Sequence, residues 1–239
     1  MTSAQLEAAR TVRENLLRIN ENIASASLRS GRRPEDVTVL AASKTISPDV
    51  VGFAIDAGLR VFGENRVQEA QEKIPVVSAG HRPITWHFIG HLQTNKVRPA
   101  LQLFEMIQSV DSIHLATALD GEASRLARKI PILIEVNTSG EPSKHGFAVT
   151  EVGQDVATLS DLVHLDITGL MTIGPLTEDL AAVRAAFRSL RALRDQLSRE
   201  YPAHTWNTLS MGMSEDYEIA IEEGATIVRL GRVLFGPRS

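Results

Sequence analysis

The stretch from residue 209 to 236, LSMGMSEDYEIAIEEGATIVRLGRVLFG, contains the residue types from which proteins build anion sites. Gly212 allows backbone N–H groups to approach an anion closely, and Ser210 and Ser214 offer hydroxyl groups. Ser214 is also a suitable N-cap for a helix over residues 215–223. The pattern predicts a phosphate-binding loop, although a helix cap without a ligand would have the same residues.

Charged residues on either side of this loop limit what it can bind. Arg229 interrupts the apolar run TIVRLG, and a buried arginine either forms an ion pair with an inward carboxylate or contacts a ligand. Glu215 and Asp216 would repel a phosphate unless they point outward, where they would favour the helix dipole. A phosphate site therefore requires both carboxylates to face away from the loop.

Lys44 follows the apolar run VTVLAAS and is the candidate nucleophile of the chain. In a strand, the alternation of side chains places Leu40, Ala42 and Lys44 on one face, and the small Ala42 leaves room beside the lysine. A lysine that simply reaches solvent fits this position. A lysine desolvated inside a barrel would instead have its pKa lowered from about 10.4, which frees the amine to condense with an aldehyde.

The elements that must position these side chains alternate between strand and helix along the chain. Eight short apolar or β-branched runs predict strands that begin at residues 37, 60, 85, 106, 131, 165, 208 and 226. Helical spacing of apolar residues is clearest over residues 47–58, 112–129, 150–162 and 177–200. The alternation predicts a parallel sheet, and eight repeats favour a closed (β/α)8 TIM barrel. An open dinucleotide-binding sheet would carry G-x-G-x-x-G after the first strand, where this chain has AASKTISPD.

The N-terminal segment predicts an amphipathic helix over residues 4–28, in which Leu16, Ile19 and Ile23 recur at helical spacing. No helical pattern follows the last strand before Ser239. We therefore expect the N-terminal helix to take the place on the barrel wall that an eighth helix would fill. Without a linker or charge block to divide it, the chain is assigned as one domain over residues 1–239.

The composition narrows the class of protein. A hydrophobic share of 43% with only 5% aromatic residues predicts an aliphatic core, as in parallel sheets covered by helices. The net charge of −4 argues against a broad nucleic-acid surface, and the absence of cysteine excludes disulfides, thiol nucleophiles and cysteine metal sites. No signal peptide and no apolar run long enough to span a bilayer is present, so we expect a cytoplasmic protein without membrane contact.

Barrel enzymes place their active sites at the carboxyl ends of the strands, and this chain has unusual residues there. They are Lys44, Asn65, His87, Asn137, Met171, Ser210, Gly212, Arg229 and Gly231. A lysine for an aldehyde, a loop for a phosphate and an arginine for a ring nitrogen together match one ligand, pyridoxal 5'-phosphate (PLP).

Several longer motifs carry a family resemblance between about residues 37 and 237. They are SKT, FGENRVQEAQEK, WHFIGHLQTNK, SVDS, ILIEVNTSGEPSKHGF, GLMTIGP, LSMGMSEDYEIAIEEGATIVRLG and LFG. On these motifs the chain resembles the pyridoxal phosphate homeostasis proteins, also called the proline synthase co-transcribed family. The resemblance implies an alanine-racemase-type barrel without the C-terminal β domain of the racemases. Glu135 stands where we expect Gln, and Pro142 and His145 are unusual in the loop after the fifth strand.

The resemblance also implies roles for the residues of the cofactor site. Lys44 would be the Schiff-base lysine, and Arg229 would face the ring nitrogen. The implied phosphate contacts are Ser210 and the backbone around Gly212, Met213 and Gly231, and the implied pocket lining is Asn65, His87 and Met171.

Two functions remain open on these grounds. The family binds and buffers PLP in vitamin B6 and amino-acid homeostasis, so a carrier without robust turnover is favoured, with apo PLP enzymes as candidate recipients. The alternative is an amino-acid racemase, which needs a base on each face of the reacting carbon. Lys44 can serve one face, and His87 and Tyr217 are the local candidates for the other. We expect, however, that His87 is a packing histidine and that Tyr217 is an anchor in the core.

Two further expectations concern metals and assembly. His87 and His91 lie four residues apart, but the segment HFIGH runs from strand into loop and lacks the helical geometry that would bring both rings together. We therefore predict no metal site. Because the second domain of the racemases is missing, we expect a monomer.

Overall fold

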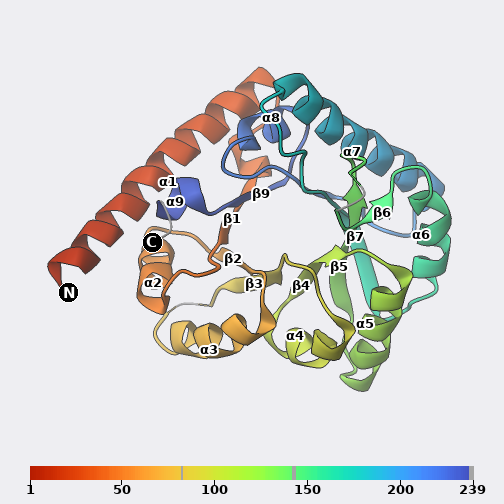
Figure 1. The fold of residues 1–239 in the computed structure, drawn as a ribbon, viewed down its shortest axis with the longest axis horizontal. Coiled ribbons are helices and arrows are strands. Elements are labelled where there is room, and N and C mark those ends of the chain that lie inside the picture. The colour runs from red at the N-terminus through yellow and green to blue at the C-terminus, as the bar shows by residue number, and fades with distance from the viewer. Residues whose placement is uncertain (82, 142–143, 237–239) are drawn as a thin grey trace.

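The computed structural model describes residues 1–81, 83–141 and 144–236, which form a parallel β-barrel surrounded by helices (Figure 1). Within these residues eight strands close the barrel: β1 (Thr38–Ala42), β2 (Val61–Glu64), β3 (Thr85–Phe88), β4 (Met106–Val110), β5 (Ile130–Asn137), β7 (Leu165–Met171), β8 (Thr208–Ser210) and β9 (Ile227–Leu230). Consecutive members of this series pair in parallel, and the pairing of β9 with β1 completes the ring. The predicted closed barrel is confirmed, with each strand beginning within one residue of its predicted start.

The strands have two different faces. In β1, Ala41 packs toward the helices in the main core, whereas Leu40 and Ala42 form a separate small cluster with Ile227. This alternation follows the period of two in a strand and places the second set inside the barrel. The short strand β6 (Phe147–Ala148) is an addition that extends the end of β5 outside the ring.

Helices cover the outside of the barrel (Figure 1). They are α1 (Ser3–Arg29), α2 (Pro48–Asp56), α3 (Val67–Ser78), α4 (Val97–Leu103), α5 (Ile113–Arg125), α6 (Val152–Ser160), α7 (Leu180–Glu200), α8 (Tyr217–Glu222) and α9 (Arg232–Phe235), with short 3-10 turns η1 (Pro34–Asp36) and η2 (Thr94–Lys96). The four helices predicted after the first and fourth to sixth strands are present at slightly shorter lengths.

The N-terminal helix α1 packs against α2, α8 and α9, so it fills the gap in the helical wall beside β1 and β9 as expected (Figure 1). Its buried face carries Val12, Leu16, Ile19 and Ile23. The expectation that no helix follows the last strand was wrong. The four residues of α9 form one short turn after β9, which was too short for helical periodicity to reveal.

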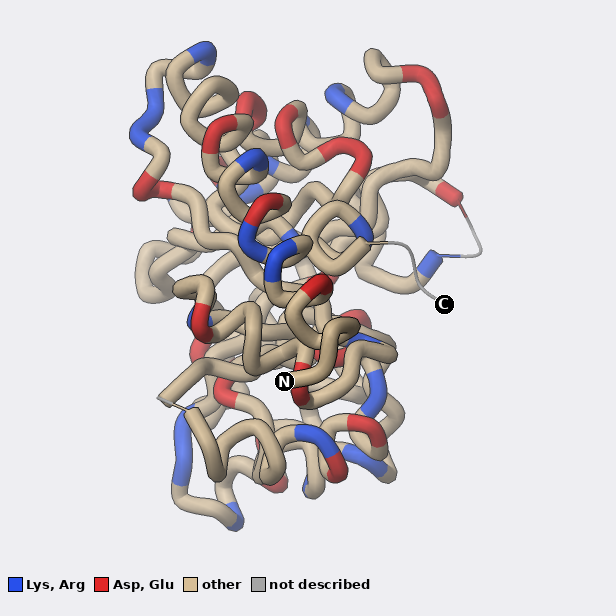
Figure 2. Tube along the Cα trace, turned by 90° about the vertical axis from the view of Figure 1, so that its left-hand side faces the viewer, with Lys and Arg blue, Asp and Glu red and all other residues tan. Residues whose placement is uncertain are grey.

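Charges of both signs are distributed along the chain. In the view of Figure 2, basic and acidic residues are interspersed over the elements rather than gathered by sign, in keeping with the small net charge. Among the described residues, every helix is too short or too polar to cross a bilayer.

Candidate cofactor site at the carboxyl ends of the strands

A chain of buried hydrogen bonds crosses the barrel interior. Arg229 donates from one terminal nitrogen to the Ser210 hydroxyl at 2.8 Å and from the other to the Thr172 carbonyl at 2.8 Å. The Ser210 hydroxyl lies 2.6 Å from Gln108 Oε1, and Gln108 Nε2 lies 2.7 Å from His87 Nδ1. Strands β3, β4, β8 and β9 and the end of β7 are thereby joined by side chains.

The donor and acceptor of each hydrogen bond in this series follow from Arg229. Because a guanidinium only donates, the Ser210 oxygen must accept, and its own proton goes to Gln108 Oε1. The Gln108 amide then donates to His87 Nδ1, which leaves the ring proton on Nε2. Burial lowers the pKa of His87 to about 4, so this neutral form is the one present near pH 7.

Arg229 bonds directly to a neutral hydroxyl and a neutral carbonyl, so of the two alternatives the direct ion pair is not found among the described residues. Burial lowers the pKa of its guanidinium to about 10, opposed by the carboxylates of Glu135 and Asp216. The Arg229 side chain still carries its charge at pH 7, which is about three units below this pKa.

Glu135 of β5 is a second group of the barrel interior that titrates. It pairs with Met171 of β7, which in turn pairs with Ser210 of β8, so one strand separates Glu135 from Ser210. Only 5% of Glu135 is exposed. Burial raises its pKa to about 7, with a further contribution from Asp111, while Arg229 and His91 oppose the rise. A glutamate at this position thus adds a group that titrates near neutral pH.

The loop after β8 is held against α8 by Gly212. Its φ of +90° favours glycine, and a Cβ there would lie 2.5 Å from the Ala220 Cβ and 3.0 Å from the Tyr217 Cα. The Gly212 carbonyl accepts from the Arg229 N–H, which ties the loop to β9. Glycine at this position therefore lets the loop pack directly against α8.

The residues that follow depart from the sequence prediction. Ser214 is not an N-cap: α8 begins at Tyr217, and the Ser214 hydroxyl accepts from the Val233 N–H at 3.2 Å. Glu215 does point outward, to Arg232 at 3.2 Å. Asp216 instead turns inward, where it accepts from the Met213 N–H at 2.6 Å and burial raises the pKa of its carboxyl. A phosphate at this loop would meet that carboxyl group.

The remaining predicted residues lie at the same end of the barrel. Lys44 is half-buried in the turn after β1, and Asn65 is half-buried directly after β2. Gly90 approaches the Asn65 backbone so closely that a Cβ would lie 2.4 Å from its carbonyl oxygen. Met171 ends β7 and is buried, and the remaining positions are those of Asn137 at the end of β5, Met213 in the loop after β8 and Gly231 after β9.

Tyr217 lies outside this group. It is buried between α8 and α1, where its hydroxyl accepts from Asn22 Nδ2 at 2.8 Å. The expectation of a core anchor is confirmed. Pro142, noted as unusual in the sequence, lies outside the described residues.

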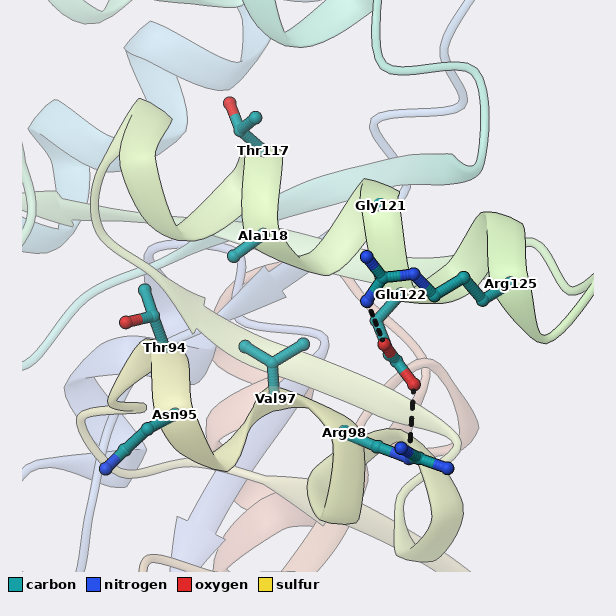
Figure 3. Close-up of a pocket in the computed structure, with 9 residues that line it drawn as sticks. All are labelled: Thr94, Asn95, Val97, Arg98, Thr117, Ala118, Gly121, Glu122 and Arg125. Atoms are coloured by element: carbon teal, nitrogen blue, oxygen red, sulfur yellow. Dashed lines mark hydrogen bonds and ion pairs between the residues drawn. The ribbon is translucent and has the colours of Figure 1, made fainter.

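A separate hollow lies in the helical layer rather than at the barrel mouth, between α4 with η2 and α5 (Figure 3). Glu122 projects into it and pairs with Arg125 at 2.9 Å and Arg98 at 3.6 Å. Glu122 of α5 is thus paired with one arginine of its own helix and one of α4.

Comparison with known proteins places these features in a family. Residues 14–239 match the model of the alanine racemase N-terminal domain. The chain is 43% identical to the pyridoxal phosphate homeostasis protein of Aquifex aeolicus, over 94% of this chain and 97% of that protein. It is 38% identical to the protein of the same name from Escherichia coli K12, over 95% and 97%.

Solved structures agree with the sequence relatives. PipY of Synechococcus elongatus PCC7942, solved with PLP bound, superposes with a TM-score of 0.81 at 39% identity, over 91% of this chain and all of PipY. An alanine racemase of Clostridium difficile shares the fold, with a TM-score of 0.73 at 16% identity, over 96% of this chain but 57% of the racemase. The chain belongs to the pyridoxal phosphate homeostasis protein family, which has the fold of the alanine racemase N-terminal domain.

Proposed function

We propose that the protein binds PLP at the carboxyl ends of its strands, as a Schiff base on Lys44, and carries or buffers the cofactor. The observation that carries this proposal is the series of buried hydrogen bonds that holds a charged Arg229 in the barrel interior. The half-buried Lys44 lies at the carboxyl end of β1, at the same end of the barrel. PipY, related at 39% identity, was solved with PLP bound, which supports the same ligand here.

The residues present fit the aldehyde and the ring nitrogen of the cofactor, whereas the inward carboxyl group of Asp216 disfavours a phosphate at the loop after β8. Two named bonds leave Arg229 with further N–H groups for a ring nitrogen, and its charge at neutral pH lets it donate without losing a proton. The proposed phosphate contacts are the backbone N–H groups around Gly212, Met213 and Gly231, of which the Met213 N–H would have to exchange the Asp216 carboxylate for the phosphate. When bound, PLP would supply an aldehyde for the lysine and a ring that withdraws electrons.

Ser210 acts on the proposed site through Arg229. The Ser210 hydroxyl already bonds Gln108 and Arg229, so in this site it positions the arginine, and a phosphate contact would require its proton to turn. Asn65, His87 and Met171 complete the wall from β2, β3 and β7.

The carrier function is favoured over racemisation by the state of the two candidate second bases. A base with a pKa of about 4, as burial gives His87, accepts a proton from carbon poorly at neutral pH. Tyr217 directs its hydroxyl to Asn22 in the helical layer, away from the barrel interior. We place this carrier in the cytoplasm as a monomer that passes PLP to apo enzymes.

Absorbance between 300 and 500 nm tests the Schiff base. Wild-type protein with added PLP should show a band near about 420 nm, which borohydride should convert into a stable adduct on Lys44. Lys44→Ala should lose both, whereas Lys129→Ala, an exposed lysine before β5, should behave as wild type. The same spectrum for wild type and Lys44→Ala would refute the assignment of the lysine.

Activity separates the two functions. Purified wild-type protein loaded with PLP should transfer the cofactor to an apo PLP enzyme and should not interconvert amino-acid enantiomers. Robust racemisation that is abolished in Lys44→Ala would overturn the carrier proposal in favour of the enzyme.

A further inference from the structure

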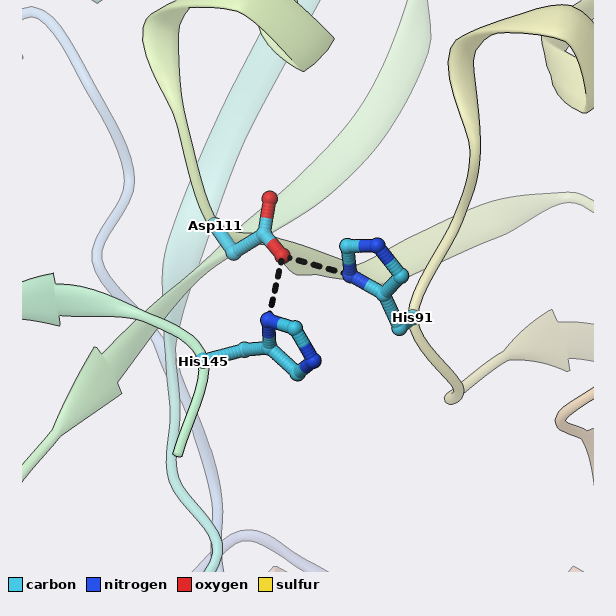
Figure 4. A group of neighbouring side chains, drawn as sticks. All are labelled: His91, Asp111 and His145. Carbon is cyan, nitrogen blue, oxygen red and sulfur yellow. Dashed lines mark hydrogen bonds and ion pairs between the residues drawn. The ribbon is translucent and has the colours of Figure 1, made fainter. Parts of the chain in front are cut away.

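A group of two histidines and an aspartate lies where the loops after β3, β4 and β5 meet (Figure 4). His91 Nδ1 is 2.8 Å from Asp111 Oδ2, and His145 Nδ1 is 3.8 Å from the same oxygen. The two imidazole rings stack with centroids 4.1 Å apart and planes inclined by 13°. One nitrogen of each ring and a carboxylate oxygen thus lie together, all within 4.8 Å of one another.

Two of these side chains are held in place by hydrogen bonds around them. The Ser112 hydroxyl donates to Asp111 Oδ1 at 3.2 Å, which leaves Oδ2 directed at the histidines. The Ser109 hydroxyl donates to the Gly90 carbonyl, so the end of β4 is tied to the backbone beside His91. The positions of His91 and Asp111 are therefore fixed relative to each other without a ligand.

The third side chain comes from a loop that is fastened at its base. Asn137, the last residue of β5, donates from Nδ2 to the carbonyls of Glu141 at 2.8 Å and Lys144 at 3.4 Å. Lys144, next to His145, directs its ammonium group to the Gly174 carbonyl and the Glu141 carboxylate. The loop presents His145 to the cluster and turns the neighbouring positive charge away from it.

We propose that His91, Asp111 and His145 form a binding site for a divalent transition metal, with Zn²⁺ as the favoured occupant. Zinc bound tetrahedrally at about 2.1 Å holds its ligand atoms about 3.4 Å apart. The two nitrogen–oxygen separations, 2.8 and 3.8 Å, lie on either side of that value. Because the two rings are stacked and nearly parallel, one imidazole must rotate about its side-chain bonds for both Nδ1 lone pairs to point at one ion. Two imidazoles with one carboxylate are a common donor set for zinc, and for iron(II) in other proteins.

The exposure of the cluster determines what kind of metal site it makes. The Asp111 side chain is 8% exposed, whereas those of His91 and His145 are 47% and 58% exposed. The anionic ligand is thus buried and the neutral ones face solvent, so a bound metal keeps a coordination position open to water. The prediction of no metal considered His87 and His91, but His87 bonds Gln108 inside the barrel, and His91 has different partners.

Titration of chelator-treated, PLP-free protein with ZnCl₂ by calorimetry tests the site, because free PLP would itself bind metal. Wild type should bind one equivalent of Zn²⁺, and His145→Ala and Asp111→Asn should each weaken binding at least tenfold. His114→Ala, an exposed histidine on α5, serves as the matched control and should retain wild-type affinity. Co²⁺ in place of zinc should give the strong visible absorption of a four-coordinate site in wild type and His114→Ala, but not in His145→Ala or Asp111→Asn.

Circular dichroism should show that each variant is folded, so that lost binding reports the ligand rather than the fold. Equal zinc affinity in wild type, His145→Ala and Asp111→Asn, or no stoichiometric binding by wild type, would overturn the proposal. Because these titrations use the PLP-free protein, neither outcome depends on whether Lys44 binds the cofactor.

Discussion

At the scale of single residues, Glu135 makes stability depend on pH. Burial raises its pKa from 4.5 to about 7, so between these values the native state holds a proton that the unfolded chain has released. The contribution of this group is fully present below about pH 4.5 and is lost as pH rises through 7. A shift of that size corresponds to about 3 kcal/mol of unfolding free energy.

Glu135→Gln keeps the shape of the side chain and removes its titration. We expect the variant to match wild type near pH 4.5 and to be more stable at pH 8 by as much as about 3 kcal/mol. Urea unfolding of both proteins across this range, in metal-free buffer, measures the difference. Parallel pH profiles would show that Glu135 is solvated or paired more strongly than its burial indicates.

Asp216 combines two opposing effects on phosphate binding that substitution can separate. Its carboxyl group accepts the Met213 N–H and also places negative charge beside the loop. Asp216→Asn keeps an acceptor and removes the charge, so PLP should bind several-fold more tightly. Asp216→Ala removes the acceptor as well, so the loop should loosen and the affinity should fall. Fluorescence titration with PLP distinguishes these outcomes, and equal affinities in all three proteins would place the phosphate elsewhere.

At the scale of elements, the close approach of β8 and α8 depends on the absence of a side chain at Gly212. Gly212→Ala would combine a positive φ with a Cβ 2.5 Å from Ala220. We expect a loss of about 2 kcal/mol or more in unfolding free energy, together with weaker PLP binding. Gly121→Ala, at an exposed position of α5 with no atom within 4 Å of the added Cβ, should be neutral or stabilising. Similar stability of the two variants would contradict the packing seen here.

The barrel strands were predicted best from the sequence. Short apolar or β-branched runs located all eight of them, because a barrel strand is buried on both faces, one toward the helices and one toward the interior. Short elements carry too few residues for a period to be visible, so α9 and the two-residue β6 were missed. Ser214 has the residue type of an N-cap, but tertiary contact with Val233 claims its hydroxyl and α8 begins later.

At the scale of the whole molecule, the site depends on contacts between residues far apart in the sequence. Ser210 and Gln108 are separated by 102 residues and bond directly. A glutamine in the run MIQSV gives no local signal of this role, and the sequence offered no reason to pair it with His87 or Ser210. Similarly, His145 was noted only as unusual, because its proximity to His91 and Asp111 arises from three loops that meet at one end of a closed barrel.

The same closure ties the N-terminal helix to the element that follows β8. Asn22 of α1 donates to the Tyr217 hydroxyl, so removal of that hydroxyl leaves a part-buried amide without this acceptor. Tyr217→Phe should lower the unfolding free energy by about 1 kcal/mol, and the double variant with Asn22→Ala should lose less than the sum of the two single losses.

PLP binding by Tyr217→Phe should stay at the wild-type level, because the hydroxyl lies in the helical layer. Urea unfolding measures the first effect, and the absorbance titration with PLP measures the second. A Tyr217 that acted as the second base of a racemase would give the opposite pattern, in which turnover disappears while stability hardly changes. The two functions considered for this barrel therefore make opposite predictions for one hydroxyl group.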